Sequence, residues 1–115
     1  MVRFLSAAAS AAFALVATPA LAADGQALFN MQCKMCHGGS VMGPTLGGIA
    51  GGPIAGRTDF TYSPALKAKA GKWTDANLDA YLAAPTVFAP GTKMMISVQD
   101  ATARAAVITY LKTLK

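Results

Sequence analysis

Two cysteines and the only histidine of the chain stand together in the segment Cys33-Lys-Met-Cys36-His37. Two residues separate the sulfurs, so both can reach the same edge of one ligand, and the imidazole follows directly. This spacing is typical of c-type haem attachment, in which each sulfur forms a thioether with a vinyl group and the histidine ligates the iron. We therefore predict one covalently attached haem c, held by Cys33 and Cys36, with His37 as an iron ligand.

Other uses of two neighbouring cysteines fit the sequence less well. A thioredoxin-like redox pair requires a surrounding βαβ pattern, and no strand is predicted on either side of Cys33. A structural zinc site needs four nitrogen or sulfur ligands, whereas the whole chain has two cysteines and one histidine. A disulfide across so short a loop would add little stability.

The sixth position on the iron needs a different ligand because there is no second histidine. A methionine thioether fills this position in many low-spin electron carriers. The first two candidates, Met31 and Met35, lie beside the attachment site and are predicted to pack in the core. Met42 follows early, in a glycine-rich loop. Met94 and Met95 lie in a late irregular segment that can return to the far face of the ring, and spacing alone does not separate these two.

The N-terminus predicts export. Residues 1–23 carry one positive charge at Arg3, then an uncharged apolar run, and end in small residues, which is the order of a secretory signal. The alternative is a retained membrane anchor, but the run is shorter and richer in alanine than a span of about 20 residues. We predict cleavage after Ala22 or Ala23, a periplasmic location without stable membrane insertion, and one domain over residues 24–115.

The remaining 92 residues make a small core, which is marginal on hydrophobic burial alone and often needs a covalent or metal staple. Without Arg3 there are nine basic and five acidic residues, a net charge of +4. This charge suits docking onto an acidic partner. The basic residues are too scattered for a nucleic-acid site, so we predict no nucleic-acid binding.

Four helices are predicted and no strand, which places the chain in the all-α class. Apolar spacing and capping residues predict helices over 24–33, 63–69, 74–84 and from about 100 to 114. The glycine-rich segment 38–56 and the segment 87–98 are predicted as loops. Loops of that length are unusual in a small domain. A large apolar ligand at the centre would supply the missing core.

The segment Pro90-Gly-Thr-Lys-Met94 resembles the ligand loop of class I cytochromes c of the mitochondrial and bacterial c2 type. The resemblance implies that Met94, rather than Met95, is the axial ligand. Gly25 and Phe29 resemble residues of the N-terminal helix of that family, and Tyr110 resembles an aromatic residue of the C-terminal helix that crosses it. The implied architecture is a cytochrome c fold with two shorter helices and long loops around one haem.

The resemblance also implies roles for side chains near the haem. The carbonyl of Pro44 would accept the N–H of His37, which fixes the tautomer of the imidazole. Tyr62 and Trp73 match two residues that donate hydrogen bonds to a haem propionate in the family.

Around the methionine, Tyr81 matches a tyrosine whose hydroxyl reaches the ligand sulfur, and Thr92 matches a hydroxyl that lines the same crevice. Two positions depart from the family pattern. Ile96 replaces a phenylalanine, and Gly52 stands where an arginine is expected near a propionate. Arg57 follows five residues later, and its role is left open.

The function implied by the resemblance is one-electron transfer, not enzymatic catalysis, because protein fills both axial positions. The implied partners are respiratory or photosynthetic membrane complexes, such as a cytochrome bc complex or a terminal oxidase, or a soluble dehydrogenase. Each would dock at the haem edge of a monomer. Few lysines precede Met94, so Lys34 and Lys93 are the predicted rim charges. The alternatives are a dedicated electron-transfer subunit of a periplasmic dehydrogenase, or a haem peroxidase or ligand-binding cytochrome with an open sixth position.

Overall fold

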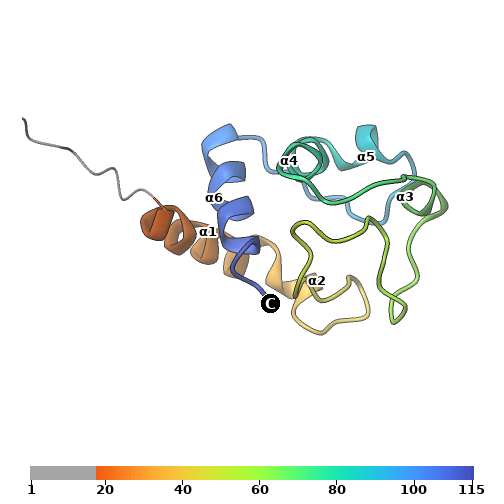
Figure 1. Cartoon of the computed structure of the whole chain (residues 1–115), viewed down its shortest axis with the longest axis horizontal. Helices are drawn as coiled ribbons and strands as arrows, with labels where there is room; N and C mark the ends of the chain where they lie inside the picture. Colours follow the sequence, from red (N-terminus) through yellow and green to blue (C-terminus); the bar gives the residue numbers. More distant parts are fainter. Residues whose placement is uncertain (1–17) are drawn as a thin grey trace, which may run out of the picture.

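A computed structural model describes residues 18–115 of the chain (Figure 1). Most of the predicted export signal lies outside these residues. The first helix, α1 (Thr18–Gln32), begins six residues before the predicted start at Asp24. Proline is well suited to the first turn, and the alanines at positions 20, 22 and 23 are strong helix formers. The helix therefore includes the position of the expected cleavage, and the cleavage stays a prediction.

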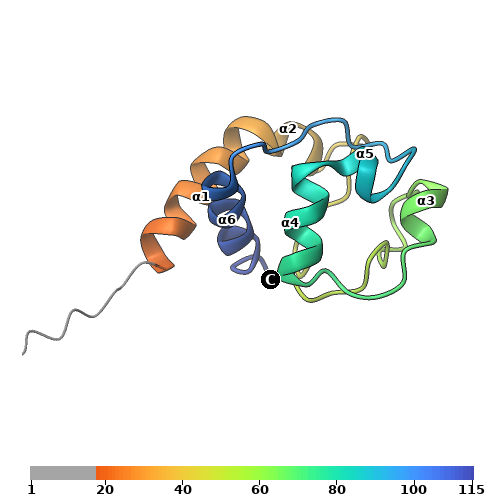
Figure 2. The same ribbon diagram turned by 90° about the horizontal axis from the view of Figure 1, so that it is seen from above.

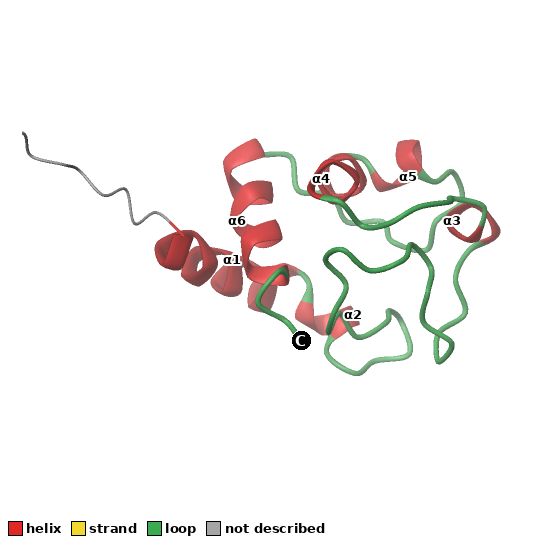
Figure 3. Ribbon diagram, in the orientation of Figure 1, coloured by secondary structure: helices red, strands yellow, loops and turns green. Residues whose placement is uncertain are grey.

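The all-α prediction is confirmed. After α1 come α2 (Lys34–His37), α3 (Pro64–Lys67), α4 (Asp75–Ala83), α5 (Pro85–Phe88) and α6 (Ala101–Leu111). Within residues 18–115 the only β-type pairing is an isolated bridge between Pro53 and Lys72. Loops connect the short helices over the rest of the domain (Figure 3).

Side-chain caps begin three of the predicted helices. The hydroxyl of Ser63 accepts the N–H of Leu66 at 3.2 Å, and the hydroxyl of Thr74 accepts the N–H of Asn77 at 3.1 Å. The carboxylate of Asp100 does the same for the first turn of α6 at 2.8 Å. These contacts satisfy N–H groups that have no partner inside the helix.

Two short helices, α2 and α5, were not predicted. The segment of α2 is too short to show periodicity. Pro85 has two effects. The helix before it, α4, ends at Ala83, two residues before the proline, and Pro85 is itself the first residue of α5. The predicted loop 87–98 therefore starts after Phe88 rather than at Val87.

Helices α1 and α6 cross in close contact (Figure 2), as the resemblance implied. Gly25 lies at the crossing, where a Cβ atom would come within 2.0 Å of the carbonyl oxygen of Ala106. One turn later the ring of Phe29 packs on that of Tyr110, with centroids 5.3 Å apart. The absence of a side chain at Gly25 therefore allows the two backbones to touch.

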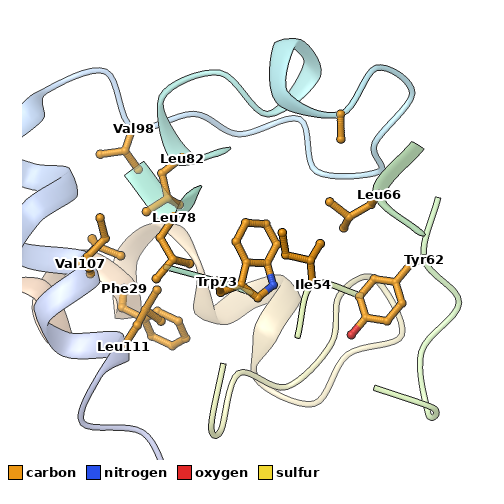
Figure 4. Close-up of a cluster of buried hydrophobic side chains, with 12 residues drawn as sticks. Phe29, Ile54, Tyr62, Leu66, Trp73, Leu78, Leu82, Val98, Val107 and Leu111 are labelled. Carbon is orange, nitrogen blue, oxygen red and sulfur yellow. The ribbon is translucent and has the colours of Figure 1, made fainter. Parts of the chain in front are cut away.

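The core has two parts that face each other (Figure 4). On one side, α4 and α6 contribute Leu78, Leu82, Val107 and Leu111, all buried. On the other side, the loops contribute Ile54, Tyr62 and Trp73, and α3 contributes Leu66. The backbone of Trp73 holds the glycine-rich loop by two hydrogen bonds, from the N–H of Gly51 at 2.8 Å and to the carbonyl of Gly52 at 2.7 Å.

Candidate cofactor site

A cavity of about 290 Å³ lies between the helices and the loops. Its walls are mostly apolar side chains, including Leu46, Leu66, Leu78 and Val107. All nine residues predicted for the site line this one cavity: Cys33, Cys36, His37, Pro44, Tyr62, Trp73, Tyr81, Thr92 and Met94. The fold thus brings together residues that are up to 61 positions apart in the sequence.

The short helix α2 and the residue that caps it present the attachment motif: Cys33 is the N-cap, and Cys36 and His37 lie in the helix. Its turn closes through a hydrogen bond from the N–H of His37 to the carbonyl of Cys33, 2.9 Å long. The two cysteines are half-buried and are not joined by a disulfide. Burial, and secondarily the nearby Cys36, raise the pKa of the Cys33 thiol.

The alternative uses of these cysteines lose support. No sheet surrounds the motif in the described part of the chain, as a thioredoxin-like site would require. Within residues 18–115 no three His, Cys, Asp or Glu side chains gather as a metal site made by protein alone.

The imidazole of His37 is held in one orientation. Its Nδ1 lies 2.8 Å from the carbonyl oxygen of Pro44. A carbonyl only accepts, so Nδ1 carries the proton and Nε2 is left with a lone pair for a metal. Gly43 makes this approach possible, because a Cβ atom there would lie 3.1 Å from the ring and 3.0 Å from the carbonyl oxygen of Cys36.

The five methionines of residues 18–115 differ in burial. Met94 is half-buried, packs against the core and lines the cavity. Met95 also reaches the cavity but is 78% exposed. The prediction that Met31 and Met35 pack in the core is wrong, because they are 79% and 84% exposed. Met31 comes two residues after the buried Phe29, which places it on the opposite side of α1.

The hydroxyl of Tyr81 pairs with the hydroxyl of Thr92, with 2.7 Å between the oxygens. Its contact with the sulfur of Met94 stays a prediction. Thr92 is buried and is held by a backbone bond from its own N–H to the carbonyl of Ala89. Burial raises the pKa of Tyr81, and the hydrogen bond with Thr92 opposes this shift in part. Tyr81 is therefore a neutral side chain that joins α4 to the methionine loop.

Tyr62 and Trp73 are both buried against the cavity. The phenolic oxygen of Tyr62 accepts the backbone N–H of Arg57 at 3.4 Å, so its own proton stays available to donate. The guanidinium of Arg57 makes two bonds to Asp59, of 3.0 and 2.9 Å, at the surface. These bonds lower the pKa of Asp59. The side chain of Arg57 thus binds a neighbouring carboxylate instead of lining the cavity.

An aromatic cluster beside the cavity was not predicted. The rings of Trp73, Tyr81 and Phe88 lie 5.1 to 5.7 Å apart, centroid to centroid. The amine of Lys69 lies 4.5 Å from the centre of the Phe88 ring, within the range of a cation–π contact. Phe88 carried no signal in the sequence because it belongs to a helix of one turn.

Lys93, predicted as a rim charge, has a second contact that the sequence did not reveal. Its amine donates to the carbonyl of Thr61 at 2.6 Å and lies 5.4 Å from the ring of Phe60. The two partners are 32 residues apart in the chain. Lys93 therefore ties the methionine loop to the loop that carries Tyr62.

These residues fit a covalently attached haem. Two thiols, an imidazole with a free Nε2 and a half-buried thioether face one apolar cavity. These are the attachment groups and axial ligands of a c-type haem. Tyr62 and Trp73 add polar hydrogens that can bind carboxylates at the edge of such a ring.

No helix among residues 18–115 combines the length and the hydropathy needed to cross a bilayer.

Comparison with known proteins points to a single family. A family model described as Cytochrome c matches residues 22–115. The chain is 44% identical over 94 residues to "Cytochrome c-type cyt cy" of Rhodobacter capsulatus, which covers 78% of this chain and 47% of that protein. It is 42% identical over 96 residues to the cytochrome c of Theileria annulata, covering 78% of this chain and 83% of the relative.

A solved structure agrees with these matches. Cytochrome cH from Methylobacterium extorquens superposes with a TM-score of 0.73 and 36% identity, over 80% of this chain and 97% of that one. The chain spans about half the length of some curated relatives, 47% of the Rhodobacter protein and 56% of a cytochrome c homolog of Rickettsia bellii.

Proposed function

The chain belongs to the cytochrome c family, and from this premise we propose that it carries single electrons through a haem c ligated by His37 and Met94. Members of this family hold haem c by covalent bonds and are electron carriers rather than enzymes. The observation that carries the proposal is the shared cavity, in which the oriented imidazole of His37 and the half-buried thioether of Met94 face the same apolar space.

The bound haem supplies a reversible one-electron couple at its iron. The residues of the chain provide the surroundings that this chemistry needs. The carbonyl of Pro44 holds the imidazole of His37 through Nδ1, so Nε2 would be the atom that ligates the iron. Filling the sixth position with Met94 leaves no place for a substrate, and a thioether there raises the reduction potential relative to a second imidazole. The apolar lining excludes water from the ring.

A ferric absorption spectrum of the purified protein tests this ligand set. We expect a low-spin spectrum with a weak band near the red edge of the visible, from a thioether on ferric iron. Met94→Ala should abolish this band, whereas Met95→Ala, the matched control at the neighbouring residue, should retain it. A high-spin spectrum of the unmodified protein would reject the proposal and favour a peroxidase or ligand-binding cytochrome.

The setting of the carrier is part of the proposal. Residues 1–23 act as an export signal that is removed, and residues 24–115 form a monomeric periplasmic domain. Its partners are a cytochrome bc complex and a terminal oxidase in a respiratory or photosynthetic chain, or a soluble dehydrogenase. A dedicated dehydrogenase subunit is the alternative. N-terminal sequencing of the periplasmic protein checks the signal, since an unprocessed Met1 would contradict removal.

Salt dependence tests the role of charge in docking. Lys34 and Lys93 are exposed and positive, and the segment before the methionine carries no other lysine. We expect the association rate with a reduced cytochrome bc complex to fall as ionic strength rises, but less steeply than for a lysine-rich cytochrome. Stopped-flow measurement between about 10 mM and 1 M salt, over which the screening length falls roughly tenfold, decides this. A rate that does not change with salt would reject electrostatic steering.

A further inference from the structure

Two ion pairs join α4 to α6, and they differ in burial. Arg104 of α6 binds the carboxylate of Asp79 at 2.7 Å, and Lys112 binds Asp75 at 2.6 Å. The side chain of Arg104 is only 14% exposed, whereas that of Lys112 is 50% exposed. Exposed pairs add little to stability, but a charge with little access to water is costly to leave without its partners. Arg104 is therefore the one of the two whose contacts should matter.

The guanidinium of Arg104 also binds the backbone of a neighbouring loop. One of its terminal nitrogens donates to the carbonyls of Val98 at 3.0 Å and Gln99 at 2.9 Å. Both residues lie near the end of the methionine loop, residues 89–100, which runs past α4 to reach α6 (Figure 2). Within the described part of the chain, the amine of Lys112 bonds only its carboxylate partner. Arg104 thus holds a helix and this loop at the same time.

The backbone around Met94 is held only from its two ends. Residues 94–97 make no backbone hydrogen bond to any other part of the chain that the structure describes. Before this stretch, the amine of Lys93 ties the loop to a distant carbonyl. After it, the N–H of Val98 donates to the carbonyl of Leu82 in α4 at 2.7 Å. The place of Met94 is therefore set by what fixes these ends.

Val98 connects the contacts of Arg104 to the cavity. Its side chain is buried and lines the same cavity as Met94, four residues before it. Its N–H is paired with α4 and its carbonyl with Arg104, so both polar groups of its backbone are used. Without the guanidinium this carbonyl loses its partner, and the stretch before it gains conformational freedom. Greater freedom of the released loop favours a detached methionine over a ligated one.

Resting on the function proposed above, we propose that Arg104 is a positioning residue for the axial ligand, because it fixes the end of the methionine loop and so keeps Met94 on the iron. Arg104 is not among the residues that line the cavity, so it acts through the loop. Arginine suits this position because its planar group donates in several fixed directions, a geometry that one lysine amine does not reproduce. Its partners are two carbonyls and a carboxylate, all of them acceptors.

Binding of imidazole to the ferric, haem-loaded protein tests this role. External imidazole ligates the iron only after the thioether of Met94 leaves, so its affinity measures how easily the loop releases its ligand. We expect Arg104→Gln to bind imidazole about tenfold more tightly than the unmodified protein, the scale of one hydrogen bond from a charged donor. Absorption spectra follow the exchange through the loss of the weak band that the thioether produces.

Two further variants separate positioning from general stabilisation. Lys112→Gln breaks the exposed link between the same two helices and should leave the imidazole affinity unchanged. Arg104→Lys keeps the positive charge but loses the forked geometry, so its affinity for imidazole should rise nearly as far as that of Arg104→Gln. If Arg104→Gln does not fold, Arg104→Lys compared with Lys112→Gln gives the same test.

Hydrogen exchange supplies a measurement that does not depend on ligand exchange at the iron. The amide of Val98 is bonded to α4 within the segment that Arg104 holds. Its protection should fall in both Arg104 variants, because local opening of the loop end becomes easier. The amides of α1, which lie outside this segment, should keep their protection, and so should the amide of Val98 in Lys112→Gln.

Three outcomes would overturn the positioning proposal. One is an unchanged imidazole affinity in both Arg104 variants, and another is an equal rise in Lys112→Gln. The third is an unmodified affinity in Arg104→Lys, because charge alone would then be sufficient and the bonds to the loop would be unnecessary. Failure of the proposed function is distinguishable from these, since an unmodified protein with an open sixth position would bind imidazole as tightly as Met94→Ala.

Discussion

The crossing of α1 with α6 and the loops around the cavity are held together in different ways. At the crossing, backbone touches backbone at Gly25 and Ala106, and the rings of Phe29 and Tyr110 pack one turn away. This contact lies entirely within the polypeptide. The helices that border the loops, α2, α3 and α5, are each only four residues long.

The loop side depends on single contacts that surround the cavity. Lys93 bonds Thr61, and Tyr81 bonds Thr92, each joining segments far apart in the chain. A helix of one turn has no stability of its own in water. We infer that the helix crossing is stabilised by protein contacts alone, whereas the loops need the group that fills the cavity.

Preventing haem attachment should have the largest effect, and it should affect the loops far more than the helix crossing. In Cys33→Ser/Cys36→Ser the haem cannot be held, and the apolar walls of the cavity would be left without contacts. We expect amide protection throughout residues 38–72 to fall to about that of an unfolded chain, with any residual protection confined to α1, α4 and α6. Hydrogen exchange of the purified variant measures this. Retained protection in the loops would show that they fold without the haem.

Gly25→Ala tests the crossing directly. The new Cβ atom would meet the carbonyl oxygen of Ala106 at 2.0 Å, so the helices must separate. We expect a loss of about 3 kcal/mol in the free energy of unfolding, at the upper end of overpacking effects, measured with guanidinium chloride. The neighbouring exposed Gln26→Ala is the control and should change stability by less than about 0.5 kcal/mol. Equal stability of the two variants would contradict the close contact.

Tyr81→Phe tests a single contact on the loop side, and we expect it to have the smallest effect on stability. Burial raises the folded-state pKa of Tyr81, so its contribution is complete below the unfolded pKa of about 10 and is lost as pH rises through the folded value. The variant should lose about 1 kcal/mol at neutral pH with the hydrogen bond to Thr92. Its stability should also no longer fall through the titration of this group.

Thr92→Val is the matched control for that experiment. It removes the same hydrogen bond but leaves Tyr81 buried, and burial is the main cause of the raised pKa. The alkaline loss of stability should therefore remain in Thr92→Val, begin at the same pH and extend to higher pH, because the hydrogen bond that lowers the folded-state pKa is gone. Unfolding titrations from about pH 8 to 12, which bracket the ordinary pKa of tyrosine, separate the two variants. If both variants behaved alike, burial would not be the cause of the shift.

Much of the fold could be predicted because its signals are local. A capping serine or threonine lies three residues from the N–H that it accepts, and Pro85 ends a helix through its own ring. The prediction for Met31 and Met35 failed for a related reason. The burial of Met31 depends on which face of α1 meets α6, and Gly25 and Phe29 decide that face; Met35 belongs to the separate one-turn helix α2.

The sequence by itself determined the attachment motif, the helical class and the single histidine, because each is a property of neighbouring residues and of composition. The choice of Met94 over Met95 as the proposed ligand required a family resemblance, since the two are adjacent and spacing from the motif does not separate them. Only the tertiary structure decided that Tyr81 bonds Thr92, that Lys93 bonds Thr61, and that Met42 and Met95 line the same cavity. The members of these pairs are 11 to 53 positions apart, and packing of the whole chain rather than any local pattern brings them together.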